Sequence, residues 1–196
     1  YCGACGDHSP AGGDNPQQVV APGCLWAARP PSWKAIKIEL LSKNTPPGIF
    51  GGLKGAGDLP ARNARTAGNS VGLAFEGTRL TWKEVNDRSC RFANALRVRG
   101  VRRGDRVGIY ARNSHQWVEA AFALAKLGAV LVTINNRLAP PEVRYILADA
   151  GVKALIVSAG ELANAQAALA GMTEIGLLVG IGTAGGAEDY EAMVAT

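Results

Sequence analysis

The stretch RVGIYARNSHQWVEAAFALAKLGAVLVTI, residues 106–134, decides the fold. Its first residues, Arg106–Ala111, form a short apolar run that predicts a strand. Ser114 is a residue type that caps helices and Gly128 is one that ends them, so we expect a helix between the two. Ala129–Ile134 is a second apolar run. Because both runs are apolar throughout instead of alternating, they predict parallel strands with helices on both faces of the sheet.

The alternation of strand and helix continues on both sides of this stretch. Upstream, Thr81 and Glu84 have the spacing of a capping box, which opens a helix that Gly100 ends. Downstream, prolines at the first turn open a further helix that Gly151 ends. The other expected elements are a helix at Leu53–Thr66, a hairpin of Val71–Phe75 with Leu80, strands at Ala154–Val157 and Ile175–Val179, and helices at Glu161–Leu169 and Glu188–Val194. This order predicts an α/β fold with a doubly wound, mainly parallel sheet flanked by helices.

The chain divides into two regions of different composition. Residues 1–52 are rich in glycine and proline and lack periodicity, which predicts an irregular tail or linker, or a disordered segment. Residues 53–196 carry the strand and helix pattern and form the expected partial α/β domain. The whole chain is 47% hydrophobic and 19% charged, which is typical of a globular protein. It begins at Tyr1 instead of Met, so we expect an incomplete chain.

No apolar run is long enough to span a membrane, and no leader pattern is present at the start of the sequence. A cytoplasmic protein is therefore expected, with peripheral association with a membrane left open.

Cysteines near the start raise the question of a metal site. Cys2 and Cys5 form a C-x-x-C pair, and His8 and Cys24 follow. Zinc modules normally supply their ligands as two close pairs, and Cys24 stands alone, so we expect no metal site. A small metal module within residues 1–52 stays the alternative. Cys90 falls on the apolar side of an expected helix and is interpreted as a small buried hydrophobe.

Arginines gather between the helix that follows Thr81 and the strand that begins at Arg106. One interpretation is a patch for phosphates or nucleic acid. The other is a solvated turn between a helix and a strand, which we favour because no aromatic residues are interspersed among the arginines. No nucleic-acid partner is therefore expected. The cluster consists of Arg97, Arg99, Arg102, Arg103 and Arg106.

The loop Gly180–Gly185 reads G-x-G-x-x-G and follows an expected strand. In a dinucleotide-binding unit such glycines bring a pyrophosphate to the start of a helix. That fingerprint normally lies in the first strand–helix unit, whereas several units precede it in this chain. The acidic ribose ligand, about 20 residues later, would fall beyond Thr196. We expect a surface loop and keep a dinucleotide-binding module as the alternative function.

The sequence lacks the common motifs of phosphate-binding loops, zinc proteases and serine hydrolases. It contains no G-x-x-x-x-G-K-[ST], no H-E-x-x-H and no G-x-S-x-G. His115 is expected to cap a helix or to be exposed, and not to catalyse. We assign no catalytic, cofactor-binding or metal-binding residue.

Several short motifs resemble the AMP-binding, acyl-adenylate-forming family. Their order and spacing match the family across about Ala61–Ser158 and more weakly to Ala195. The resemblance is to the N-terminal part of an acyl-CoA synthetase, or fatty-acid–CoA ligase. The matching segments are Leu80–Asn86, Arg91–Leu96, Gly100–Val107, Asn113–Ser114 with Trp117, Ala125–Val130, Asn135–Leu138 with Glu142, Tyr145–Leu147 and Asp149–Gly151.

This resemblance implies a reaction in two steps. A small carboxylic acid attacks the α-phosphate of ATP with the help of Mg²⁺, and coenzyme A then displaces AMP to give a thioester. The family's phosphate-binding loop is expected soon after Thr196. We therefore expect an inactive fragment that binds no cofactor, while the parent enzyme uses ATP, Mg²⁺ and coenzyme A.

The resemblance also suggests where a cleft could lie. Asn113, Asn135 and Arg137 come at strand ends and could line one, although structural roles are expected for them. Within the family, the residue types at Asn135–Leu138 resemble those of fatty-acyl or related acyl-CoA ligases more than those of carrier-protein adenylation modules. A homodimer is left open.

Overall fold

The computed structural model describes residues 55–183 and 185–195 of the 196-residue chain. The predicted tail and its cysteines, including Cys2, Cys5 and Cys24, lie outside the described residues. In chain order, with η marking a 3-10 helix, the elements are η2 (Ala56–Asp58), α2 (Leu59–Ala67), β1 (Val71–Phe75), β2 (Thr78–Thr81), α3 (Trp82–Val98), β3 (Arg106–Tyr110), α4 (His115–Leu127), β4 (Val130–Ile134), α5 (Pro140–Ala150), β5 (Ala154–Ser158), η3 (Ala159–Glu161), α6 (Leu162–Leu169), β6 (Leu177–Ile181), β7 (Glu188–Asp189) and α7 (Tyr190–Ala195).

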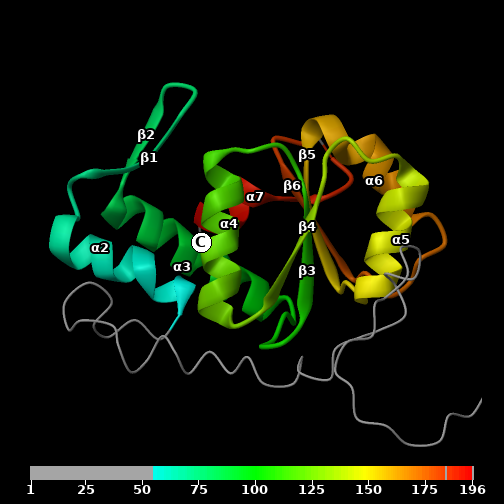
Figure 1. Ribbon diagram of the computed structural model, residues 1–196, viewed down its shortest axis with the longest axis horizontal. Helices are drawn as coiled ribbons and strands as arrows, with labels where there is room; N and C mark the ends of the chain where they lie inside the picture. Colours follow the sequence, from blue (N-terminus) through cyan, green and yellow to red (C-terminus); the bar gives the residue numbers. More distant parts are fainter. Residues whose placement is uncertain (1–54, 184, 196) are drawn as a thin grey trace, which may run out of the picture. The chain divides into compact units, whose positions relative to one another are not determined.

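Five strands form a parallel sheet in the order β4-β3-β5-β6-β7 (Figure 1). β3 pairs with β4 from Arg106 opposite Val130, and with β5 from Val107 opposite Ala154. β1 and β2 form a separate antiparallel hairpin, as predicted. The predicted parallel sheet is therefore confirmed.

Helices cover both faces of this sheet, so the doubly wound prediction is also confirmed. Figure 1 shows α3, α4 and α7 on one face and α5 and α6 on the other. Alternate strand residues supply the two cores: Val107 and Ile109 pack toward the first face, and Leu155 and Val157 toward the second. This arrangement explains why β3, β4, β5 and β6 are mostly apolar.

The helix ends follow local rules that the sequence shows. The Oγ1 of Thr81 accepts from the backbone N–H of Glu84 at 3.3 Å, and the Glu84 carboxylate accepts from the Thr81 N–H at 2.7 Å. Ser114 caps α4 by accepting from the N–H of Trp117 at 3.1 Å. Gly128 ends α4 with a φ of 73°, in the left-handed region that favours glycine.

The last elements differ from the prediction. The strand predicted at Ile175–Val179 is found at Leu177–Ile181. The helix predicted at Glu188–Val194 begins only at Tyr190, because Glu188 and Asp189 form β7. These two residues pair with β6 through their backbone, and side-chain periodicity does not reveal such pairing.

Candidate functional site

The candidate site is the region beyond the carboxyl ends of β3 and β5, which we call the candidate crevice because open α/β sheets bind ligands at such a position. After β3 the chain turns into α4 on one face of the sheet, and after β5 it turns through η3 into α6 on the other. Because β3 and β5 are neighbours, their outgoing connections diverge between them. Ligands of open α/β sheets usually bind in the crevice that such a divergence creates.

Three side chains from the two connections meet at this crevice. The Nε of Arg112 donates to Glu161 at 3.2 Å, and the backbone N–H of Arg112 donates to the Ser158 hydroxyl at 3.3 Å. The Ser158 hydroxyl in turn donates to the other oxygen of Glu161. The Glu161 side chain is 5% exposed, whereas that of Arg112 is 77% exposed. The buried carboxylate therefore ties the connections together, and the guanidinium faces solvent.

None of these three residues belongs to a recognisable sequence motif. Glu161 is expected at the start of a helix and Ser158 directly after a strand, and Arg112 lies 49 positions from Glu161. Only the pairing of β3 with β5 brings them together. The one signal in the sequence is that Arg112 and Ser158 directly follow predicted strands.

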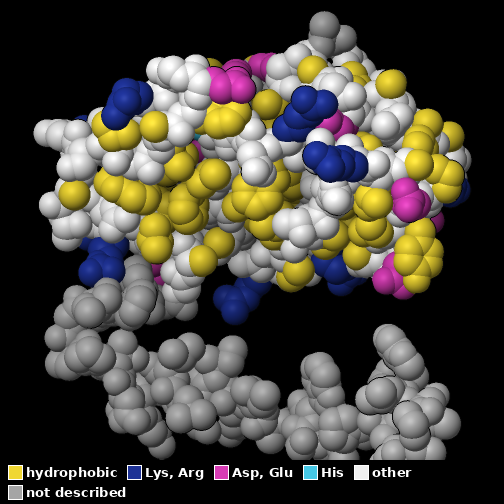
Figure 2. Space-filling view, turned by 45° about the horizontal axis from the view of Figure 1, so that its top comes forward, with side chains coloured by type: hydrophobic (Ala, Val, Ile, Leu, Met, Phe, Trp, Pro, Cys, Tyr) yellow, Lys and Arg dark blue, Asp and Glu magenta, His cyan; other side chains and the backbone are white. Residues whose placement is uncertain are grey.

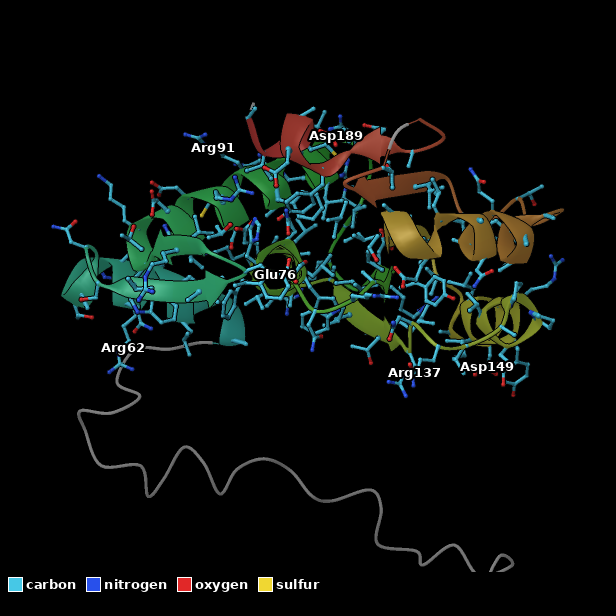
Figure 3. The ribbon with its side chains drawn as sticks, turned by 90° about the horizontal axis from the view of Figure 1, so that it is seen from above. Arg62, Glu76, Arg91, Arg137, Asp149 and Asp189 are labelled. Carbon is cyan, nitrogen blue, oxygen red and sulfur yellow. The ribbon has the colours of Figure 1, made fainter. Side chains whose placement is uncertain are left out.

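The residues expected at a cleft make local contacts. The Asn135 side chain accepts from the backbone N–H of Arg137 at 3.0 Å, which closes the turn after β4. The Tyr110 hydroxyl donates to the Leu138 carbonyl at 2.9 Å and holds this turn against β3. Asn113 is exposed, and Arg137 points away from the domain (Figure 3). These contacts agree with the structural roles expected for Asn135, and they do not bring Asn113 and Arg137 together.

The face that includes this edge of the sheet has no single concentration of charge. Figure 2 turns the edge toward the viewer and shows many hydrophobic side chains, with a few Lys, Arg, Asp and Glu side chains of both signs among them. A surface of mixed charge gives little attraction to a polyanion such as a triphosphate. Charge alone therefore does not mark a phosphate site on this face.

The loop Gly180–Gly185 lacks the geometry of a dinucleotide fingerprint. Gly180 lies inside β6, and a Cβ at this position would be 1.8 Å from the Oγ1 of Thr183, which folds back over the strand. A fingerprint loop runs from a strand directly into a helix. This loop instead leads into β7, and α7 begins only at Tyr190. The glycines thus shape a loop, and the dinucleotide alternative has no support from the fold.

Two other sequence interpretations need correction. His115 was expected to cap a helix or to be exposed, but Ser114 makes the cap and His115 is half-buried as the first residue of α4. The His115 Nδ1 is buried and has no hydrogen-bond partner among the described residues.

Cys90 was expected to be buried, but it is half-buried as a free thiol, with its Sγ 3.9 Å from the Asn86 side-chain oxygen. The α3 surface beside Asn86 is therefore more polar than its periodicity suggests.

Arginines of the cluster donate hydrogen bonds to backbone carbonyls at the ends of helices. Arg99 pairs with Glu188 and also donates to the Ala95 carbonyl near the end of α3. Arg106 donates to the carbonyl of Gly151, at the end of α5, at 3.2 Å. Cations at helix C-termini satisfy free carbonyls and complement the helix dipole. This use of the guanidinium groups agrees with the turn interpretation.

A buried ion-pair network that the sequence did not indicate joins three helices. Glu119 on α4 is fully buried and binds Arg88 of α3 at 2.8 Å. The Tyr190 hydroxyl of α7 donates to the second oxygen of Glu119 at 2.9 Å. Arg88 also binds Glu191 at 2.9 Å, and Gln116 donates to Glu191 at 3.1 Å. The network fixes α7 against α3 and α4.

The environment of this network shifts two pKa values. Burial, together with the nearby Glu119 carboxylate that accepts its proton, raises the pKa of Tyr190 well above its usual range. Burial alone would lower the pKa of Arg88, but its hydrogen bonds to Glu119 and Glu191 outweigh that effect and raise it. Tyr190 thus stays neutral and Arg88 stays charged, as expected for structural groups.

A cavity of about 230 Å³ lies at the opposite, amino edge of the sheet. It is lined by Leu147, Met172 and Glu174, among others, and Arg144 borders it. The Nη1 of Arg144 already donates to the carbonyls of Ala168 and Ala170. The cavity lies away from the carboxyl ends of the strands, where this fold usually binds ligands, so the cavity is a poor candidate for the main site.

Across residues 55–183 and 185–195, no group of three or more His, Cys, Asp or Glu side chains could hold a metal ion. Within these ranges, no helix is long and apolar enough to cross a membrane.

The topology defines a doubly wound α/β domain of the kind that binds ligands at its carboxyl edge. The family model described as "AMP-binding enzyme" matches residues 60–191. The chain belongs to this family, as the sequence motifs predicted.

Named relatives and solved structures agree with this assignment. The chain is 42% identical over 117 residues to a feruloyl-CoA synthase of an Amycolatopsis species, covering 60% of this chain and 24% of that protein. It is 43% identical over 81 residues to a long-chain-fatty-acid–CoA ligase of Mycobacterium tuberculosis, covering 41% and 16%.

Among solved structures, the anthranilate CoA ligase AuaEII in complex with anthranoyl-AMP superposes with a TM-score of 0.68 at 31% identity, covering 72% of this chain and 27% of that one. The chain spans about a quarter or less of the length of the curated relatives named above.

Proposed function

We propose that this chain is the N-terminal part of an ATP-dependent acyl-CoA synthetase. In the proposed reaction, a carboxylate attacks the α-phosphate of ATP, which forms an acyl-adenylate and releases pyrophosphate. The coenzyme A thiol then attacks the acyl carbon, AMP leaves, and a thioester forms. The observation that supports this proposal best is the family match over residues 60–191, in which the relatives named above are CoA ligases or synthases.

The described residues give limited support for a cofactor site of their own. Within residues 55–183 and 185–195, no group of three or more His, Cys, Asp or Glu side chains could hold a metal ion. At the candidate crevice, Arg112 is a single exposed cation and Glu161 is already bound. We therefore assign ATP, Mg²⁺ and coenzyme A to the parent enzyme and derive no step through them from this chain. In this proposal, the chain contributes the carboxyl edge of its parallel sheet and the core of this domain to the parent enzyme.

A pyrophosphate-release assay on the full-length parent enzyme tests the proposal. We expect release with ATP, Mg²⁺ and one or more acids from a panel of hydroxycinnamic, benzoic and fatty acids. Omitting coenzyme A should abolish thioester formation while leaving acyl-adenylate detectable by mass spectrometry. Formation of ADP instead of AMP, or no turnover with any acid, would overturn the proposal.

A second, independent test uses the isolated chain. We expect no AMP formation and no calorimetric signal on titration with Mg²⁺–ATP, because the resemblance places the family's phosphate-binding loop after Thr196. Tight nucleotide binding by the isolated chain would contradict this part of the proposal.

Substrate class, location and assembly follow from the same family assignment. We propose a small carboxylic acid as substrate, with fatty-acyl or related acids favoured, and a cytoplasmic enzyme that can form a homodimer. Cell fractionation checks the location, and light scattering coupled to size-exclusion chromatography checks the assembly.

A further inference from the structure

Cationic side chains gather along the amino edge of the sheet, away from the candidate crevice. All six are exposed, and they come from the end of α3, the turn before β3, β3 itself and the turn before β5. We call this set the cationic edge: Arg97, Arg99, Arg102, Arg103, Arg106 and Lys153.

Backbone contacts show that these segments form one continuous edge. The N–H of Gly104 donates to the Gly128 carbonyl at 2.8 Å, which joins the turn before β3 to the end of α4. The N–H of Lys153 donates to the Arg106 carbonyl at 2.9 Å, which joins it to β5. Because the five strands of this sheet are parallel, their amino ends lie on the same side of it. The segments that carry these cations are thus neighbours along one edge.

Most of this positive charge has no opposite charge beside it. Arg99 pairs with Glu188, and Lys153 pairs with Asp105 at 2.6 Å. Among the described residues, the other four cations form no ion pair: Arg102 and Arg106 donate to backbone carbonyls, and no side-chain hydrogen bond joins Arg97 or Arg103 to this part of the chain. Four of the six cations of the edge therefore lack an ion-pair partner within the described residues.

Exposed apolar side chains lie among these cations. Val98 is 81% exposed, between Arg97 and Arg99, and Val130 is 48% exposed and pairs with Arg106 across the sheet. They are two of the four large exposed hydrophobic side chains of the described residues. Anionic lipid surfaces attract basic clusters of this size, and an apolar side chain among them can enter the headgroup region. Single-stranded nucleic acid would instead favour stacking aromatics, which residues 97–106 lack.

We propose that the cationic edge docks onto an anionic membrane surface, with Val98 entering the headgroup layer. This inference does not depend on ligase chemistry, because none of these residues lies at the candidate crevice. The proposed membrane-binding face is the amino edge of the sheet. It lies opposite the carboxyl edge, where the fold would bind its ligand.

Vesicle co-sedimentation of the full chain tests the proposal. We expect binding to vesicles of 30% phosphatidylserine in phosphatidylcholine, no binding to pure phosphatidylcholine, and loss of binding at high salt. Each Lys or Arg near an anionic surface contributes about fivefold to partitioning, so Arg97→Gln with Arg103→Gln should weaken it by at least about tenfold. The matched control, Arg65→Gln with Arg79→Gln, removes two exposed arginines elsewhere and should have a much smaller effect.

Val98→Trp supplies a test in the opposite direction. The side chain is exposed, so the larger ring fits without repacking, and it should strengthen vesicle binding severalfold. Circular dichroism confirms that each variant is folded. Equal effects of the two arginine pairs, or no gain from Val98→Trp, would overturn the proposal. Tighter binding to a duplex oligonucleotide with the same dependence on Arg97 and Arg103 would also overturn it, in favour of nucleic acid.

Discussion

The hydroxyl of Tyr190 donates a hydrogen bond of 2.9 Å to the carboxylate of Glu119, which has no solvent exposure. Arg88 binds the other oxygen of that carboxylate at 2.8 Å, so α3, α4 and α7 meet at one buried charge. A buried charge is tolerated only when its partners satisfy it. The position of α7 therefore depends on a residue 71 positions earlier in the chain.

Removing the Glu119 carboxylate should destabilise the domain strongly. Glu119→Ala leaves the Tyr190 hydroxyl without an acceptor and Arg88 without its buried counter-charge. We expect the free energy of unfolding to fall by about 2–4 kcal/mol, because breaking a buried pair on one side leaves an uncompensated group. Urea unfolding followed by circular dichroism measures this.

Asp149→Asn is the control for the loss of one negative charge. Asp149 is exposed on α5, and its substitution should change stability by less than about 0.5 kcal/mol. Similar losses for Asp149→Asn and Glu119→Ala would show that net charge, not the buried network, determines stability.

The raised pKa of Tyr190 should make the domain sensitive to alkali. Above pH 10, about the ordinary value for tyrosine, the unfolded chain loses the hydroxyl proton while the folded domain keeps it. The folded state then binds more protons than the unfolded state, so stability falls as pH rises. Tyr190→Phe removes this contribution, and its free energy of unfolding should fall less steeply between about pH 10 and 11.5. Parallel slopes for the two proteins would contradict the assignment.

Gly57 packs directly against the backbone of α4. A Cβ on Gly57 would be 2.6 Å from the backbone nitrogen of Lys126 and 2.8 Å from the carbonyl carbon of Ala125, neither of which can rotate away. Gly57→Ala should therefore displace η2 and cost about 1–3 kcal/mol. Gly55→Ala is the matched control, because no atom of the described residues, apart from Gly55 and its chain neighbours, lies within 4 Å of its Cβ position. Thermal unfolding compares the two, and equal melting temperatures would refute the close packing.

Much of the fold could be predicted because its signals are local. Thr81 and Glu84 stand three residues apart, and Gly128 directly follows the last apolar residue of α4, so each boundary depends on neighbours in the sequence. β3, β4, β5 and β6 are mostly apolar because both faces of the sheet are covered, and this property is visible in the sequence itself.

The polar contacts could not be predicted in the same way. Arg88 and Glu119 look like exposed charges on two separate helices, and nothing in either segment indicates a shared buried position. Arg112 and Glu161 meet only because β3 lies next to β5, a strand order that periodicity does not determine. Glu188 and Asp189 were assigned to a helix because backbone pairing with β6 leaves no side-chain pattern.

Asp105 should make the domain sensitive to acid. Its hydrogen bonds from Lys153 and from the backbone N–H of Arg102 lower the pKa of this carboxyl below its ordinary value. The folded state then releases the proton more readily than the unfolded state, so the stabilisation is present above about pH 4 and is lost as pH falls. Asp105→Asn should flatten the dependence of unfolding free energy on pH between about 5 and 2. An unchanged profile, measured by urea titration at each pH, would contradict this.

At the candidate crevice, Glu161 and Arg112 should differ in their contributions to stability, although they bind each other. The Glu161 side chain is 5% exposed and holds the Ser158 hydroxyl, so Glu161→Ala leaves a polar group without its partner and should cost about 1–3 kcal/mol. The Arg112 side chain is 77% exposed, where an ion pair contributes at most about 1 kcal/mol, so Arg112→Ala should cost little. Urea unfolding of both variants distinguishes the two roles. An equal loss for Arg112→Ala would mean that the guanidinium, and not the contact between Ser158 and Glu161, holds the connections after β3 and β5 together.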